Sequence, residues 1–102
     1  MALPTSSCPP LRRDMLPAPV DLSAPIHLPR PEAIRLATRQ AQAIHPEVML
    51  LAWFDRNTGE FSPPIPCCLE DRPGWLAYAL SRGADLIISL NGEEYVFAFK
   101  RL

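Results

Sequence analysis

The sequence predicts an α+β domain in which two helices lie on one face of a small antiparallel sheet of three to four strands. Three observations support this fold class. Two stretches have apolar residues at helical spacing, two turn sequences separate short runs of β-branched and aromatic residues, and the elements follow in the order α-β-β-α-β-β. The 102 residues, 48% of them hydrophobic, suffice for one domain with a small core.

Residues 1–30 are expected to form a disordered, proline-rich segment ahead of this domain. Eight of the 13 prolines lie within the first 31 residues, and the apolar residues between them show no periodicity. Proline fixes φ and lacks a backbone N–H, so it interrupts both helices and sheet ladders. The predicted single domain therefore covers residues 31–102.

Two helices are predicted, at residues 32–44 and 71–83. In the first, one face is apolar and the other is charged or polar. The apolar face holds Ala33, Ile34, Ala37, Ala41 and Ile44, with Leu36 at its edge. The second is apolar almost all round, which is typical of a well-buried helix.

The first predicted hairpin joins residues 48–55 to residues 60–62. The run at 48–55 is apolar but short, and a turn sequence follows it, which favours a strand over a helix. Gly59 is expected to adopt a positive φ in the turn.

The second predicted hairpin joins residues 85–90 to residues 93–100 through Asn91-Gly92. Asn-Gly between apolar, β-branched and aromatic runs is a strong hairpin signal, and both turn residues are expected to have positive φ. A two-residue turn sets the expected register, which pairs Leu90 with Glu93, Ile88 with Tyr95 and Leu86 with Phe97.

The two faces of this second hairpin carry different side chains. The predicted core face bears Leu86, Ile88, Leu90, Tyr95, Phe97 and Phe99. The opposite face bears Ile87, Val96 and Ala98, and two helices that lie on the core face cannot also cover it. A contiguous apolar patch usually marks a contact surface. We therefore expect a weak homodimer or a protein partner at Ile87, Val96 and Ala98.

Composition argues against several classes of partner. Ten basic and 11 acidic residues give a net charge of −1, which disfavours binding to nucleic acid through bulk charge. No apolar run is long enough to span a bilayer, and the N-terminus lacks the apolar core of a secretory signal. A cytoplasmic protein with reduced cysteines is expected, without a membrane partner.

Two adjacent cysteines, Cys67 and Cys68, follow Pro66 in an expected loop. One interpretation is a thiol-dependent redox or metal-binding accessory protein, with His45 or Cys8 completing a soft-metal site. The interpretation that we favour is two small apolar side chains packed beneath a loop. The cysteine spacing matches neither a disulfide framework nor a zinc motif, so no cofactor or metal is predicted.

Arg35 and Arg39 lie one turn apart on the polar face of the first predicted helix. Such a pair could hold a phosphate or carboxylate, as in a small-anion-binding regulatory domain, although a solvated face is the commoner reason for the pattern. No motif names a reaction, so an enzyme is not favoured. The preferred hypothesis is a small protein-interaction or accessory module.

The stretch HPEVMLLAWFDRNTGEFSP, followed by PGWLAYALSRGADLIISLNGEEYVFAF, resembles the small families of uncharacterised single-domain prokaryotic proteins. The resemblance covers residues 31–102. It implies a compact α+β fold and no known activity, so it assigns a role to no residue.

Overall fold

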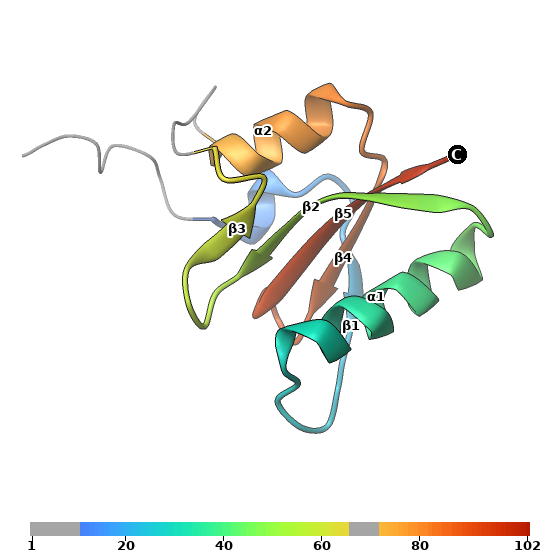
Figure 1. Ribbon diagram of the computed structural model, residues 1–102, viewed down its shortest axis with the longest axis vertical. Coiled ribbons are helices and arrows are strands. Elements are labelled where there is room, and N and C mark those ends of the chain that lie inside the picture. Colours follow the sequence, from blue (N-terminus) through green and yellow to red (C-terminus); the bar gives the residue numbers. More distant parts are fainter. Residues whose placement is uncertain (1–10, 66–71) are drawn as a thin grey trace, which may run out of the picture.

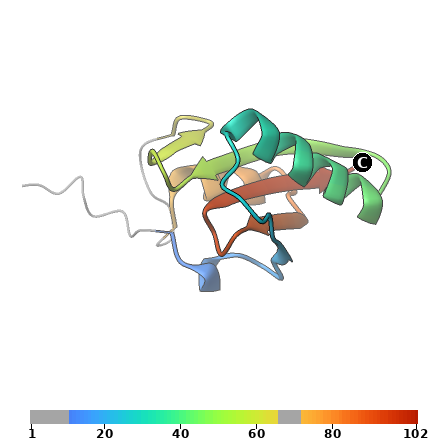
Figure 2. The ribbon, with the colours of Figure 1, turned by 90° about the horizontal axis from the view of Figure 1, so that it is seen from below.

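Two helices lie on opposite faces of one five-stranded sheet in the computed structural model, which describes residues 11–65 and 72–102 (Figures 1 and 2). The α+β class is as predicted, but the layers differ from the expected arrangement of both helices on one face. The α-helices are α1 (Arg30–Ile44) and α2 (Gly74–Ser81), and a short 3₁₀ helix spans Arg13–Met15. The strands are β1 (Val20–Leu22), β2 (Val48–Asp55), β3 (Glu60–Ser62), β4 (Leu86–Leu90) and β5 (Tyr95–Arg101).

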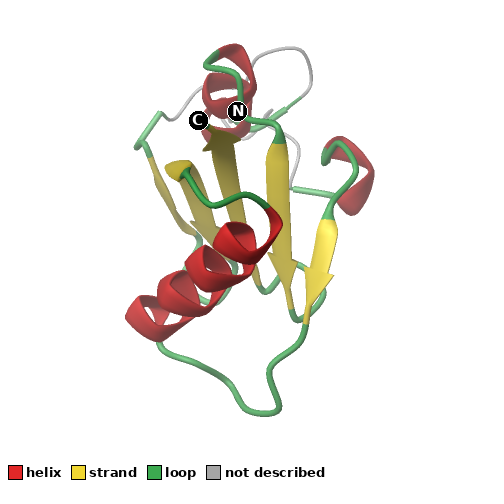
Figure 3. Cartoon of the chain, turned by 90° about the vertical axis from the view of Figure 1, so that its right-hand side faces the viewer, coloured by secondary structure: helices red, strands yellow, loops and turns green. Residues whose placement is uncertain are grey.

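The sheet is mixed, with the strand order β1-β4-β5-β2-β3. Both predicted hairpins are present, because β2 pairs antiparallel with β3 and β4 pairs antiparallel with β5. The two hairpins join through an antiparallel β2–β5 ladder, which has a register shift between Leu50 and Ala52. The additional strand, β1, runs parallel to β4 at the sheet edge. Figure 3 shows the strands edge to edge behind α1.

The side of the sheet facing α1 holds most of the core that the sequence predicted, but Ile34 is only partly buried there and Ile44, at the end of α1, is 44% exposed. Ala33, Ala37 and Ala41 are fully buried on α1, and their small side chains let the helix approach the sheet closely. They pack in one cluster with the predicted core residues Leu86, Ile88, Leu90, Tyr95, Phe97 and Phe99.

The side of the sheet facing α2 holds a second core, and the prediction that this side lies open is wrong. Ile87, Val96 and Ala98 are at most 1% exposed. Trp75, Leu76 and Ala79 of α2 cover them, together with Leu11 and Leu16. The prediction failed because it assigned both helices to one face, whereas α2 crosses to the other. These three residues are therefore not an exposed contact surface.

Residues 11–30 belong to the domain, so the prediction of a disordered segment over residues 1–30 is wrong for this part. Leu11 and Leu16 are buried, and Val20 to Leu22 form β1 in register with β4. Arg13 also links the segment to the β4–β5 turn, since its guanidinium donates hydrogen bonds to Asp21 at 2.6 and 2.8 Å and to Glu93 at 2.8 Å. Apolar burial and one strand pairing thus order a proline-rich sequence. The remainder of the predicted segment, residues 1–10, lies outside the described residues.

The turn between β4 and β5 contains four residues rather than the predicted two. Leu90 pairs with Tyr95, so the register is displaced by two residues from the expected one. Asn91 and Gly92 have the predicted positive φ values, 52° and 65°, but Glu93 also has a positive φ, 66°. The Glu93 N–H donates to Ser89 Oγ at 3.0 Å, which holds the wider turn. A two-residue displacement keeps every side chain on its predicted face.

Within the described residues, neither helix has both the length and the apolar character needed to cross a membrane.

Gly92→Val is expected to destabilise the fold by about 1–3 kcal/mol, because a β-branched residue resists the positive φ that this turn requires. No other atom lies within 4 Å of a Cβ built at Gly92, so the cost arises from the backbone alone. Gly92→Asn is the matched control and is expected to cost less, because asparagine tolerates this conformation. Chemical denaturation of both variants measures the difference, and equal midpoints for Val and Asn would contradict the assignment.

Leu16→Ala is expected to lower the free energy of unfolding by about 2–5 kcal/mol, because Leu16 is 5% exposed and packs in the α2-side core. Arg13→Ala is expected to cost less, because Arg13 and Asp21 are 45% and 63% exposed and exposed ion pairs contribute little, which leaves the pair with Glu93, 15% exposed, as the main loss. Urea denaturation of the full chain measures both variants. An unchanged midpoint for Leu16→Ala would show that residues 11–22 do not pack on the domain.

Candidate functional site

An open hollow of about 410 Å³ lies between α1 and the segment that connects β1 to α1. The two arginines that the sequence singled out, Arg35 and Arg39, both line it, together with Glu32 on the same helix. The opposite wall is mainly apolar and consists of Ser23, Ala24, Pro25, Ile26 and Leu28, with Leu36 contributed by α1. We call this site the arginine hollow. It combines a cationic rim with an apolar wall.

Hydrogen bonds to the rest of the fold hold the apolar wall in place. The Ala24 N–H donates to Asn91 Oδ1 at 2.9 Å, and the Tyr95 hydroxyl donates to the Leu28 carbonyl at 2.7 Å. The Asn91 N–H in turn donates to the Leu22 carbonyl at 2.8 Å, which ties the end of β1 to the β4–β5 turn. The wall therefore has a defined position although it contains no regular secondary structure.

The cationic rim has two arginines with different surroundings. Arg35 donates to Glu32 at 2.8 Å, in an ion pair whose side chains are 64% and 49% exposed. Within the described residues, Arg39 forms no side-chain hydrogen bond or ion pair, although it is exposed beside the same hollow. The rim therefore carries a net positive charge that protein carboxylates only partly neutralise.

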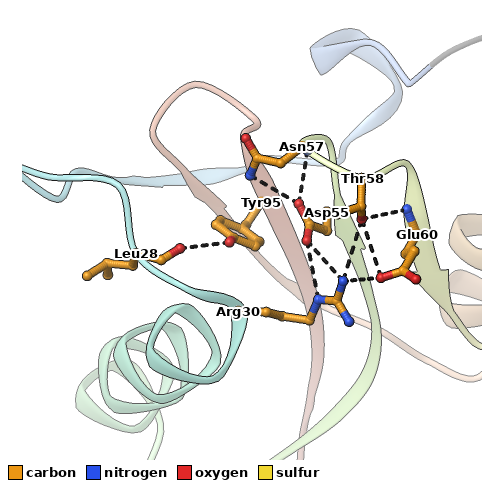
Figure 4. A network of polar contacts seen from close by, with 7 residues as sticks. All are labelled: Leu28, Arg30, Asp55, Asn57, Thr58, Glu60 and Tyr95. Carbon is orange, nitrogen blue, oxygen red and sulfur yellow. Dashed lines mark hydrogen bonds and ion pairs between the residues drawn. The ribbon is translucent and has the colours of Figure 1, made fainter.

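A second polar site, which the sequence analysis missed, surrounds Arg30 at the start of α1 (Figure 4). The Arg30 guanidinium donates to Asp55 Oδ2 at 3.1 Å and also pairs with Glu60. Its Cζ lies 4.5 Å from the centroid of the Trp53 ring, within cation–π distance. These contacts attach the first turn of α1 to the β2–β3 hairpin.

Asp55 is the buried member of this network, with a residue exposure of 3%. Burial by itself would raise the pKa of Asp55, but hydrogen bonds from Arg30 and Asn57 outweigh it, so the pKa lies below its usual value. The Asn57 N–H donates to Asp55 Oδ1 at 2.9 Å, a local carboxylate-to-backbone bond of the kind that starts turns. One sequence signal for this turn was present, because Asp55 ends an apolar run and lies two residues before Asn57.

A hollow of about 470 Å³ lies beside this network and is lined by Arg30, Trp53, Gly59, Glu60, Phe61 and Pro64. Both cationic and anionic groups at its rim are already paired with each other. It therefore has less unsatisfied charge to offer a ligand than the arginine hollow has.

His27 and Glu94 form a further pair that sequence reasoning missed. Their side chains meet at 2.5 Å between His27 Nδ1 and Glu94 Oε2, and the His27 ring stacks near Tyr95 with centroids 6.3 Å apart. Burial tends to raise the pKa of Glu94, but hydrogen bonds from His27 and Asn91 lower it below the usual range. No nearby sequence pattern indicates this pair, because 67 residues separate its members.

The remaining predicted site residues lie elsewhere. Cys67, Cys68 and Cys8 lie outside the described residues, so the thiol hypothesis stays a prediction. His45, proposed as a partner for them, contacts the Leu102 carbonyl through Nε2 at 2.9 Å. Within the described residues, no group of three or more histidine, cysteine, aspartate or glutamate side chains is arranged to hold a metal ion.

The fold is that of a small three-layer α+β domain with its helices on opposite faces of a mixed sheet. The chain belongs to the family described as "Domain of unknown function (DUF5619)", which matches residues 19–99. The resemblance to a small uncharacterised family is thereby confirmed. The match begins at residue 19 rather than 31, so it includes β1 and the apolar wall of the arginine hollow.

Two comparisons lead to Archaeoglobus fulgidus. A protein of this organism named "Uncharacterized protein" is 36% identical over 75 residues, which cover 71% of this chain and 80% of the relative. A crystal structure of a protein from the same organism, described as novel, is similar with 31% identity and a TM-score of 0.71. That comparison covers 82% of this chain and 93% of the other. The fold is therefore shared with an experimentally determined structure.

Asp55→Asn is expected to lower the free energy of unfolding at pH 7 by roughly 1–3 kcal/mol, because Arg30 loses its buried carboxylate partner. The pKa of Asp55 is lower in the folded protein than in the unfolded chain, where it is about 3.9. The Asp55 carboxylate therefore adds to the free energy of unfolding in full above the unfolded pKa, and this addition is lost as the pH falls through the folded pKa. Urea denaturation between pH 2 and 7 measures the effect. The free energies of unfolding of the native protein and of Asp55→Asn should become equal at the lowest pH. A difference that stays constant from pH 7 to pH 2 would contradict the assignment.

Proposed function

We propose that this protein is an interaction module whose arginine hollow binds an acidic segment of a partner protein. The observation that supports the proposal most directly is that Arg35 and Arg39 line the same hollow as the apolar wall at residues 23–28. A segment with a carboxylate beside an apolar side chain would satisfy both parts of this site. The proposal retains the protein-interaction role that the sequence favoured.

The charged rim suits a carboxylate ligand. Arginine presents several N–H donors in a planar arrangement that matches two carboxylate oxygens. Arg39 forms no side-chain hydrogen bond or ion pair among the described residues, and the exposed pair of Arg35 with Glu32 contributes little stability. Both guanidinium groups could therefore turn toward a ligand at small cost to the fold.

The apolar wall suits a peptide better than a bare inorganic anion. Ile26 is 68% exposed, and Pro25 and Leu28 extend the same wall. A phosphate ion would leave this apolar surface in water, whereas an aliphatic side chain beside the carboxylate would cover it. Because asparagine and tyrosine side chains position the wall, the site is formed before binding.

Arg39→Gln is expected to weaken binding of a capped peptide, in which two glutamates are flanked by leucines, by roughly tenfold. Isothermal titration calorimetry at low salt measures the affinity, and the corresponding glutamine peptide serves as the ligand control. Arg82→Gln is the matched protein control, because Arg82 is exposed but stacks on Tyr78 of α2, outside the hollow. Its affinity is expected to remain unchanged.

Two results would overturn the proposal. If the glutamate and glutamine peptides bound equally, or Arg39→Gln bound as tightly as the native protein, the arginine rim would not recognise carboxylates. If inorganic phosphate bound as tightly as the glutamate peptide, the apolar wall would contribute nothing. That second result would favour the small-anion role considered for Arg35 and Arg39.

A further inference from the structure

Glu32 gives the two arginines of the arginine hollow different surroundings. All three side chains line the hollow from α1, but Arg35 lies three residues after Glu32 and donates to it at 2.8 Å. Arg39 lies seven residues after Glu32, or about 10 Å along the helix axis. It is exposed, and within the described residues it forms no side-chain hydrogen bond or ion pair. A ligand therefore meets Arg39 with its N–H donors available and Arg35 with a carboxylate already beside it.

Glu32 also reduces the positive charge of the rim. In the described part of the chain, the residues that line the hollow include one acidic side chain, Glu32, and two basic ones, Arg35 and Arg39. Because the Glu32–Arg35 pair is exposed, breaking it costs the fold little, but the Glu32 charge then stays at the rim. Like charges that lie one helical turn apart repel each other. A second ligand carboxylate that reached Arg35 would therefore be repelled by Glu32.

The apolar surface of the hollow also favours a ligand with few charges. Ile26 is 68% exposed on the opposite wall, and Leu36 adds an apolar side chain from α1. A second carboxylate placed against these side chains would lose hydration without gaining a hydrogen-bond donor. An aliphatic side chain in the same place would instead remove apolar surface from water. The hollow thus suits one carboxylate with aliphatic neighbours better than a cluster of acidic residues.

We propose that Glu32 is the specificity-determining residue of the arginine hollow and restricts its ligand to a segment with a single carboxylate. That carboxylate binds at Arg39, and aliphatic residues on either side of it cover the apolar wall. Glu32 acts as an internal carboxylate that occupies Arg35, so the native site gains little from a second acidic residue in the ligand. This inference rests on the proposed function of the hollow and specifies the chemistry of the segment that it binds.

Isothermal titration calorimetry at low salt tests the inference with capped peptides in which leucines flank two central positions. These positions hold two glutamines, one glutamate and one glutamine in either order, or two glutamates. The native chain is expected to bind the better one-glutamate peptide roughly tenfold more tightly than the glutamine peptide. The second glutamate should change this affinity by less than about twofold, because Glu32 offsets its attraction to Arg35.

Glu32→Gln is expected to bind the two-glutamate peptide at least about threefold more tightly than the better one-glutamate peptide, because Arg35 then has no carboxylate beside it. The double variant Glu32→Gln/Arg35→Gln should lose this preference. Glu32 and Arg35 are 49% and 64% exposed, so both variants should fold, which their melting temperatures check. Glu47→Gln is the matched control, because Glu47 is an exposed glutamate between α1 and β2, outside the hollow. It should bind every peptide as the native chain does.

Two results would overturn this inference while leaving the proposed function in place. In the first, the second glutamate strengthens binding to the native chain as much as it does to Glu32→Gln, so Glu32 does not select the ligand. In the second, the double variant keeps the preference for two glutamates, so the second carboxylate does not meet Arg35. Failure of the proposed function gives a different result, since the native chain would then bind the glutamine peptide as tightly as the glutamate peptides. That result would overturn both proposals.

Discussion

The rest of the structure depends on the burial of the β4–β5 hairpin on both of its faces. All five residues of β4 and the first five of β5 are buried. A hairpin that is apolar on both sides needs cover on both sides, since each exposed face would leave large side chains in water. α1 covers one face, and α2 with residues 11–16 covers the other. β1 and β2 complete the ladders at its two edges.

The sequence pattern was sufficient to identify both helices and both hairpins, but not the layers. Alternation in 85–90 and 93–100 separates two side-chain sets correctly, and a two-residue error in register leaves those sets unchanged. Ile87, Val96 and Ala98 were themselves a signal of burial on the second face, because strands buried on both sides show nearly continuous apolar runs. Which helix covers which face depends on tertiary packing, which local periodicity does not encode.

The candidate site shows the same division between local and long-range information. Helical spacing alone predicts that Arg35 and Arg39 lie one turn apart. The opposite wall of their hollow comes from residues 23–28, whose place depends on the pairing of β1 with β4. A three-residue strand is too short to show periodicity, and the prolines around it argue for disorder. The Arg30–Asp55 contact likewise joins residues that lie 25 positions apart in the sequence. The local pattern therefore indicates only the turn after Asp55, and not its pairing with Arg30.

The parallel pairing of β1 with β4 constrains the order in which the chain folds during synthesis. Val20 meets Ile88, so the first strand leaves the ribosome 68 residues ahead of its partner. Until β4 emerges, Leu16 and Val20 have no completed sheet to join, whereas α1 and the β2–β3 hairpin rest on local contacts. The N-terminal segment therefore docks late, after closure of a long loop. Through most of its synthesis the nascent chain therefore keeps Leu16 and Val20 unpaired, and such apolar side chains are the surface that a chaperone at the ribosome exit binds.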